Sequence, residues 1–248
     1  MADSKFILFA HPRSGSTILA EILALHPQLR VLIEPFAEHF HTWSPGNKNY
    51  LAQIVDPASL DRQLTDLFTA YDGIKVTSWP LSFELYHHML LHEGRKIIFL
   101  RRENLLRAAV SNAISHQTHI WEKRKAPADM DARYKGLQDI PVDDLAAWIE
   151  AVKKGMDAHE TGLQSRPKDM VKMVTFETVY DHPSHQKNLV HDLFDFLGVE
   201  RMYSDEMKWR LDKTNSQMNA EDRYRAIPNY QDIDARLSCK DYGFLFGS

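Results

Sequence analysis

Short apolar runs, separated by segments long enough for crossover helices, set the predicted architecture of this chain. The first run, Phe6 to Ala10, is apolar at every position, as expected of a central parallel strand covered on both faces. Similar runs follow at Val31 to Ile33, Gly73 to Val76, Lys96 to Leu100 and Met170 to Phe176. The pattern predicts an α/β fold with a roughly five-stranded, mostly parallel sheet flanked by helices.

Helical spacing of apolar residues marks the segments that flank these strands. Isoleucines and leucines recur from Ile18 to Leu25, and His26-Pro27 ends that predicted helix. Two later segments each carry one apolar face and are predicted to be scaffold helices, namely Pro141 to His159 and Pro183 to Leu197, the second ending at Gly198. Two polar, irregular segments are predicted to be loops at a substrate mouth, namely His41 to Asn49 and Ala126 to Ile140.

Composition limits the class of protein. The chain has 248 residues, of which 44% are hydrophobic, so we expect one domain spanning residues 1–248. A formal net charge of −4 argues against a nucleic-acid partner, which would require a broad basic face. The lone cysteine, Cys239, excludes an internal disulfide and favours a cytoplasmic location. The run from Phe6 to Ala10 is too short for a signal sequence or a membrane span, so we expect no membrane partner.

A loop rich in serine and glycine links the first predicted strand to the first predicted helix. Its sequence, Pro12-Arg13-Ser14-Gly15-Ser16-Thr17, aims backbone N–H groups and the positive end of a helix at one point, as in phosphate sites. An ordinary N-capped helix start is the alternative interpretation. A nucleotide-kinase loop would need a second glycine and a Gly-Lys-Ser/Thr ending, so this is not a Walker loop.

The loop resembles the 5′-phosphosulfate loop of sulfotransferases that use 3′-phosphoadenosine 5′-phosphosulfate (PAPS). The resemblance is to the carbohydrate and bacterial branch, which carries arginine where cytosolic members carry lysine, and it continues through Leu25-His26-Pro27 and Glu34-Pro35-Phe36. It implies a P-loop-like sulfotransferase fold, with PAPS as co-substrate and PAP as its product. It also implies that PAPS is bound by Arg13, Ser14, Gly15, Ser16 and Thr17.

Glu34 is the favoured general base. It stands at the end of the second predicted strand, beside the crevice of an open α/β sheet, where a carboxylate could meet a bound acceptor. A helix N-cap or turn partner near Pro35 is the alternative role. If Glu34 is structural, the base is to be sought among four histidines: His39, His41, His116 and His119.

A second strand–turn–helix pattern runs from Lys96 to Ser111, with Asn104 as the predicted N-cap. Arg102 and Ser111 can offer a guanidinium fork and a hydroxyl to a phosphate. The block resembles the family's 3′-phosphate motif, although the spacing from arginine to serine is one residue longer than usual. Arg101 and Arg107 therefore compete with Arg102 for this role.

The rest of the chain adds weaker candidates. Lys213 opens a late basic segment that resembles the one folding over the nucleotide in relatives, and the block from Val174 to Val199 resembles the family's scaffold. Lys75 either faces the crevice or is a surface charge at a strand end.

His116 and His119 could be metal ligands, but a position in the core or in the acceptor pocket is favoured for both. Three tryptophans could line the acceptor pocket, stack on the adenine or simply pack, namely Trp43, Trp79 and Trp121.

The resemblance implies an in-line transfer of a sulfuryl group from PAPS to a hydroxyl or amine of a small acceptor, such as a sugar or a natural product. Glu34 would take the acceptor proton, while Arg13 and the loop N–H groups would stabilise the departing 5′-phosphate without a metal. Two alternatives are a P-loop-type small-molecule kinase and a non-catalytic nucleotide-binding protein. The oligomeric state and the acceptor are left open.

Overall fold

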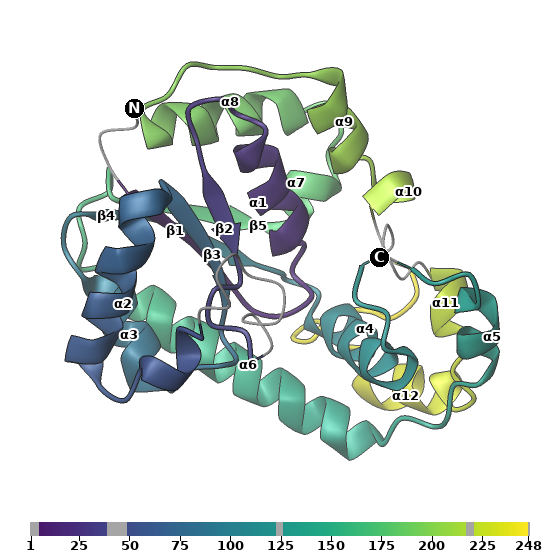
Figure 1. Ribbon diagram of the computed structural model, residues 1–248. Coiled ribbons are helices and arrows are strands. Elements are labelled where there is room, and N and C mark those ends of the chain that lie inside the picture. The colour runs from purple at the N-terminus through teal and green to yellow at the C-terminus, as the bar shows by residue number, and fades with distance from the viewer. Residues whose placement is uncertain (1–4, 39–48, 123–125, 217–220, 248) are drawn as a thin grey trace.

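The computed structural model describes residues 5–38, 49–122, 126–216 and 221–247. Its centre is a sheet of five parallel strands (Figure 1), which confirms the predicted α/β class. The spatial order is β2-β3-β1-β4-β5, with β1 (Lys5–Ala10), β2 (Val31–Ile33), β3 (Gly73–Thr77), β4 (Arg95–Arg101) and β5 (Val171–Thr175). The strands on one side of β1, namely β2 and β3, precede in the sequence those on its other side, namely β4 and β5. The direction of the strand order therefore changes at β1, and a crevice forms at the carboxyl end of that strand.

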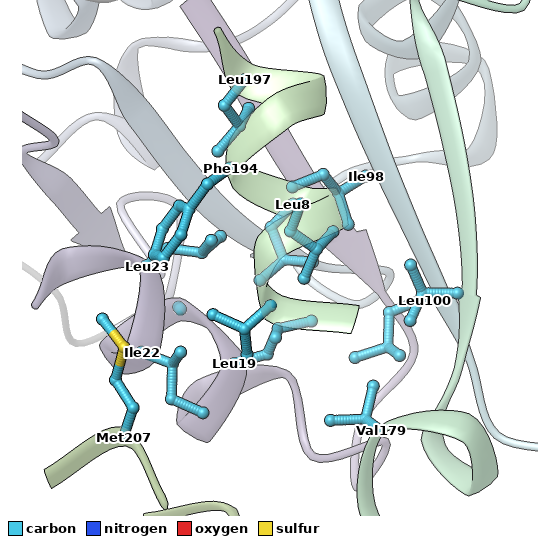
Figure 2. Close-up of a cluster of buried hydrophobic side chains, with 14 of the residues drawn as sticks. Leu8, Leu19, Ile22, Leu23, Ile98, Leu100, Val179, Phe194, Leu197 and Met207 are labelled. Atoms are coloured by element: carbon cyan, nitrogen blue, oxygen red, sulfur yellow. The ribbon is translucent and has the colours of Figure 1, made fainter. Parts of the chain in front are cut away.

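The apolar run of the first strand supplies both faces of the sheet. Phe6, Leu8 and Ala10 belong to one buried cluster, whereas Ile7 and Phe9 belong to another, as the two-residue period of a strand requires. The first cluster is covered by α1 (Ser16–Ala24), α7 (Phe176–Tyr180), α8 (Gln186–Leu197) and α9 (Asp205–Leu211). Figure 2 shows this packing, in which leucines of α1 and Phe194 of α8 meet the sheet.

The opposite face and the carboxyl edge of the sheet carry the remaining helices (Figure 1). The opposite face is covered by α2 (Pro57–Ala70), α3 (Phe83–Leu91) and part of α6 (Val142–Leu163), with the short η3 (Leu51–Gln53) beside α2. A third buried cluster joins α4 (Leu105–Thr118), α5 (Met130–Lys135), α6 and α12 (Tyr230–Leu237). Two single turns follow in the chain: α10 (Lys213–Ser216) lies beside α9, and α11 (Glu221–Tyr224) contributes Tyr224 to the third cluster.

The signals for helix ends give the expected local structure. Asn104 caps α4, because its side chain accepts a 2.9 Å hydrogen bond from the N–H of Arg107. Gly198 ends α8 in the left-handed conformation, with φ of 73°. Within the described ranges, no helix combines the length and the apolar character needed to cross a bilayer.

The prediction of a loop from Ala126 to Ile140 is wrong in part, because α5 forms inside it. Tyr134 buries its ring in the third cluster, and Arg133 pairs with Asp129 one turn earlier, with Nε 3.0 Å from the carboxylate. The polar composition of this segment gave no sign of a helix, because Tyr134 is its one buried residue. The predicted fifth strand also ends one residue early, since Phe176 begins α7. Most of the other predicted loop, His41 to Asn49, lies outside the described residues.

Candidate functional site

A cavity of about 1400 Å³ opens at the carboxyl ends of the strands. It exceeds the roughly 300–1,000 Å³ of a typical ligand pocket, so it can hold a nucleotide together with a second molecule. Of the nine residues assigned to catalysis or PAPS binding, all but Ser14 line this cavity, namely Arg13, Gly15, Ser16, Thr17, Glu34, Arg102, Ser111 and Lys213. The topology of the sheet therefore brings five separate segments of the chain to one cavity.

The loop between β1 and α1 adopts an unusual backbone conformation. Arg13 and Gly15 have φ values of 63° and 79°, in the left-handed region that a residue other than glycine seldom enters. Gly15 is the N-cap of α1, and no side chain caps the helix. The hydroxyl of Ser14 instead donates a 2.7 Å bond back to the carbonyl of His11. The ordinary N-capped interpretation is therefore wrong, and the end of α1 faces the cavity without a side-chain cap.

His11 joins this loop to the end of β4. Its Nε2 accepts the backbone N–H of Arg102 at 3.0 Å, so its proton lies on Nδ1, which donates to the carbonyl of Pro12 at 2.8 Å. Burial lowers the pKa of His11 to about 4, and the charge of Arg102 adds to this effect. The imidazole is therefore neutral near pH 7, as both hydrogen bonds require.

Arg13 reaches across the cavity to helix α4. Its Nε donates to the hydroxyl of Ser111 at 3.0 Å, and its Nη1 donates to the carbonyl of Trp121 at 2.9 Å. Burial, together with the nearby charge of Arg102, lowers the pKa of Arg13 to about 10, so the guanidinium remains charged at neutral pH. The sequence suggested no such link between the first loop and Ser111.

Arg102 is buried, with 6% of its surface exposed, and it lines the cavity. Its guanidinium lies 4.3 Å from the centre of the Phe176 ring, and its Nη1 donates to the carbonyl of Arg13 at 3.0 Å. Its Nε is buried without a hydrogen-bond partner, and it forms no ion pair with any residue the structure describes. A buried cation without a counter-ion is costly, and a bound anion would remove that cost.

The two competing arginines are engaged elsewhere. Arg101 forms ion pairs on α6, with Glu160 and, at 2.9 Å, with Asp157. Arg107 donates to carbonyl groups of the C-terminal segment, including that of Phe244 at 3.1 Å. Neither arginine is among the described residues that line the cavity.

Glu34 lies at the end of β2 in a left-handed conformation, with φ of 55°. Its carboxylate forms an ion pair with Lys75 and accepts hydrogen bonds from Thr77, at 3.0 Å from the hydroxyl and 3.3 Å from the N–H. These partners belong to β3, so the Glu34 carboxylate is not an N-cap. The Lys75 Nζ also lies 3.5 Å from the hydroxyl of Thr17. The Glu34–Lys75 pair therefore lies between the β2 edge and the first loop.

Lys75 is a site residue that sequence reasoning left undecided. Only 2% of its surface is exposed, so it is not a surface charge at a strand end. Phe176 and Tyr180, which the sequence assigned to scaffold, also line the cavity. Lys213 lines it as well, paired with Asp181 and with its Nζ 5.7 Å from the centre of the Phe176 ring.

Exposed aromatic residues line another part of the cavity. Trp79 and Trp121 are 72% and 44% exposed, so they are not core packing. His116 meets the Trp121 ring edge-on at 4.9 Å, and His119 follows the end of α4 with φ of 55°, so only His116 belongs to the helix. No group of three or more His, Cys, Asp or Glu side chains that could hold a metal is found in the described part of the chain. Three predicted candidates lie outside the described residues: His39, His41 and Trp43.

No family model matches this chain, and no curated protein matches it. Solved structures with a similar fold include a sulfotransferase from Alicyclobacillus acidocaldarius, with 19% identity over 94% of each chain and a TM-score of 0.47. The sulfotransferase domain from the curacin biosynthetic pathway has 14% identity over 85% of this chain and 80% of that one, with a TM-score of 0.49. Mouse sulfotransferase SULT7A1, complexed with PAP, has 16% identity over 89% and 68%, with a TM-score of 0.44. These likenesses are remote, so a function has to be argued from the site.

Proposed function

We propose that the chain is a single-domain sulfotransferase that moves a sulfuryl group from PAPS to a hydroxyl or amine of a small acceptor and releases PAP. The observation that carries the proposal is the buried guanidinium of Arg102, which has no carboxylate partner among the described residues and faces the same cavity as the uncapped end of α1. One cavity thus offers two separate anion sites. PAPS carries charged groups at both its 5′ and 3′ positions, which suits such a cavity.

Each of the two anion sites binds one end of the nucleotide in this proposal. We call the loop Pro12–Thr17 the first arm, and Arg102 with Ser111 the second arm. The loop Pro12–Thr17 holds the 5′-phosphosulfate through its N–H groups and the end of α1. Arg102 and Ser111 hold the 3′-phosphate through a charge-assisted bond and a hydroxyl. Lys213, which lies beside the Phe176 ring, adds positive charge to the same end of the cavity.

The chemistry is an in-line displacement in which this chain supplies a base and positive charge. The acceptor oxygen or nitrogen forms a bond to sulfur while the bond from sulfur to the 5′-phosphate oxygen breaks, and the acceptor proton passes to Glu34. Arg13 and the loop N–H groups stabilise the charge that develops on the departing phosphate. Lys75 contacts both Glu34 and Thr17, so it positions the base and adds charge next to the transferred group.

The remainder of the cavity receives the acceptor in this proposal. Its exposed tryptophans, Trp79 and Trp121, offer flat apolar surfaces on which a sugar or a ring of a natural product can stack. A cytoplasmic location, suggested by the lone Cys239, belongs to the same proposal.

The two alternatives are less well supported. A small-molecule kinase would need the Gly-Lys-Ser/Thr ending that this loop lacks. A non-catalytic nucleotide-binding protein would account for Arg102. It would not account for the carboxylate of Glu34 at the cavity edge beside Lys75.

Thermal stability and turnover test the proposal in sequence. PAP should raise the melting temperature of the protein more than ATP with magnesium does, because only PAP fills both anion sites. Incubation with PAPS and a panel of sugars, phenols and amines should then release PAP, measured by liquid chromatography. A larger shift with ATP and magnesium would support a kinase. PAP binding without turnover on any acceptor would support a non-catalytic nucleotide-binding protein.

A further inference from the structure

Helix α7 contacts the first anion-binding arm through Tyr180. The Tyr180 hydroxyl donates a 2.7 Å hydrogen bond to the carbonyl of Gly15, which also accepts the 3.2 Å bond from the N–H of Leu19. Tyr180 is buried, and burial raises the pKa of its hydroxyl, so the group stays protonated and remains a donor. Tyr180 therefore fixes the residue from which α1 begins.

The rings of α7 also pack directly against this residue. A Cβ atom added to Gly15 would lie 2.5 Å from the Cε2 atom of Tyr180 and 3.1 Å from the Cδ2 atom of Phe176. The two rings themselves are 4.8 Å apart at their centres. The left-handed turn of the loop thus rests on a rigid aromatic surface.

The same helix contacts the second arm. The Phe176 ring lies 4.3 Å from the guanidinium carbon of Arg102 and supports it on one side. The Glu177 carboxylate accepts the N–H groups of Glu103 and Asn104, at 3.0 Å and 3.2 Å. These two residues form the turn between Arg102 and helix α4. One short helix thus holds the starting points of both arms.

We propose that α7 is a positioning element of the nucleotide site, in which Tyr180 orients the loop Pro12–Thr17 and Phe176 orients Arg102. The inference rests on the proposed function, since it assigns a 5′-phosphate to the first arm and a 3′-phosphate to the second. Both side chains project from one turn of helix, so α7 sets the separation of the two arms. Tyr180 acts through Gly15, and Phe176 acts through Arg102.

Ligands that carry only one of the two phosphates test this inference. Isothermal titration and competition against PAP would compare adenosine 5′-monophosphate, adenosine 3′-monophosphate and PAP. Tyr180→Phe keeps the ring and removes one hydrogen bond, so affinity for the 5′-monophosphate and for PAP should fall about two- to tenfold. Its affinity for the 3′-monophosphate should not change. Phe176→Leu should lower affinity for the 3′-monophosphate more than affinity for the 5′-monophosphate, because its ring contacts the guanidinium of Arg102 as well as Gly15.

A matched control is available on the same side of the sheet. Tyr203 packs against the first buried cluster, does not line the cavity, and has no hydroxyl hydrogen bond with the described residues, so Tyr203→Phe should leave all three affinities unchanged. If wild type binds PAP and Tyr180→Phe weakens both monophosphates equally, or neither, the positioning role is wrong while the proposed function stands. A wild type that does not bind PAP would overturn the proposed function and this inference together.

Discussion

Arg13 and Ser111 are 98 positions apart in the sequence, yet the Arg13 Nε donates a 3.0 Å hydrogen bond to the Ser111 hydroxyl. Arg102 in turn donates to the carbonyl of Arg13, also at 3.0 Å. The loop after β1, the turn after β4 and helix α4 therefore form one hydrogen-bonded unit. Ser111→Ala and Arg102→Ala each remove one of these two bonds.

Arg102→Ala should weaken PAP binding strongly. The substitution removes a buried cation that has no counter-ion in the described structure, together with its charge-assisted bond to the ligand. Such bonds contribute about 1.5–3 kcal/mol, so affinity measured by isothermal titration should fall by at least about tenfold. Arg101→Ala is the matched control, because its guanidinium is paired on α6, and PAP affinity should stay close to wild type. Unchanged affinity in Arg102→Ala would remove this arginine from the site.

Ser111→Ala should have a smaller effect on the same measurement. The variant loses a neutral hydroxyl, which contributes about 0.5–1.5 kcal/mol, and leaves the Nε of Arg13 without this partner. We expect PAP affinity to fall about two- to tenfold, less than for Arg102→Ala. A loss larger than that of Arg102→Ala would mean that Ser111, and not Arg102, dominates the 3′-phosphate site.

Glu34→Gln should lower kcat and leave PAP affinity nearly unchanged. Glutamine keeps the shape of the side chain but cannot accept the acceptor proton, and a general base contributes about 10²–10⁴-fold to the rate. The variant also loses the ion pair with Lys75, so its folding must be checked by its melting temperature. Glu38→Gln removes another carboxylate from the cavity wall and should retain most of the turnover.

Retained turnover in Glu34→Gln would make Glu34 a structural residue. The described histidines on the cavity wall, His116 and His119, would then be the first to test as the base. His39 and His41 would follow. Comparison of their pH–rate profiles would identify the group that titrates.

The sheet and the first loop were predictable because their signals are local. An uninterrupted apolar run such as Phe6 to Ala10 suits a strand covered on both faces, and Gly15 within a serine-rich turn marks the start of a helix. Packing in three dimensions distinguishes the two arginines that the sequence could not. Arg101 and Arg102 are adjacent and chemically identical, and only the carboxylates of α6 show which of them turns away from the cavity.

Long-range contacts account for what the sequence left open or predicted wrongly. Lys75 could have been a solvated strand end, and its burial depends on Glu34, a residue 41 positions away on a neighbouring strand. Helix α5 is polar along most of its length, and burial of Tyr134 is what holds it. Neither contact leaves a periodic signal in the local sequence. The distance between such partners along the chain is the physical reason that the role of Lys75 was left open and that the loop prediction over α5 was wrong in part.

Gly15→Ala should destabilise the protein and weaken PAP binding. Gly15 has φ of 79°, and an added Cβ would lie 2.5 Å from the Tyr180 ring, so the loop or the ring has to move. We expect a loss of about 1–3 kcal/mol in the free energy of unfolding. Gly155 is a matched control in α6, where an added Cβ meets nothing within 4 Å, and Gly155→Ala should stabilise the protein by about 0.5–1 kcal/mol. Denaturant unfolding measures both, and equal effects of the two substitutions would contradict the packing described for the loop.

His159 should make the stability of the protein depend on pH in the acid range. It lies in α6, stacked 4.4 Å from the Phe83 ring and edge-on to Phe9 at 5.3 Å, with its Nδ1 buried and without a hydrogen-bond partner. Burial lowers its pKa from 6.5 to about 4, and the charge of His87 adds to this effect. Between these two values the unfolded chain binds a proton that the folded protein does not. The stability from the neutral imidazole is therefore fully present above pH 6.5 and is lost as the pH falls toward 4.

His159→Phe should remove this loss of stability, because phenylalanine fills the same aromatic stack without a titrating group or an unpaired nitrogen. The melting temperature of wild type should fall more steeply than that of the variant between pH 7 and pH 4, with a difference in unfolding free energy on the order of 1–3 kcal/mol at the acid end. His11, whose pKa burial also lowers to about 4, titrates in both proteins and cancels in the difference. His182 is exposed, so His182→Gln should follow the wild-type curve. Parallel curves for wild type and His159→Phe would mean that His159 takes up its proton in the folded protein near its ordinary pKa.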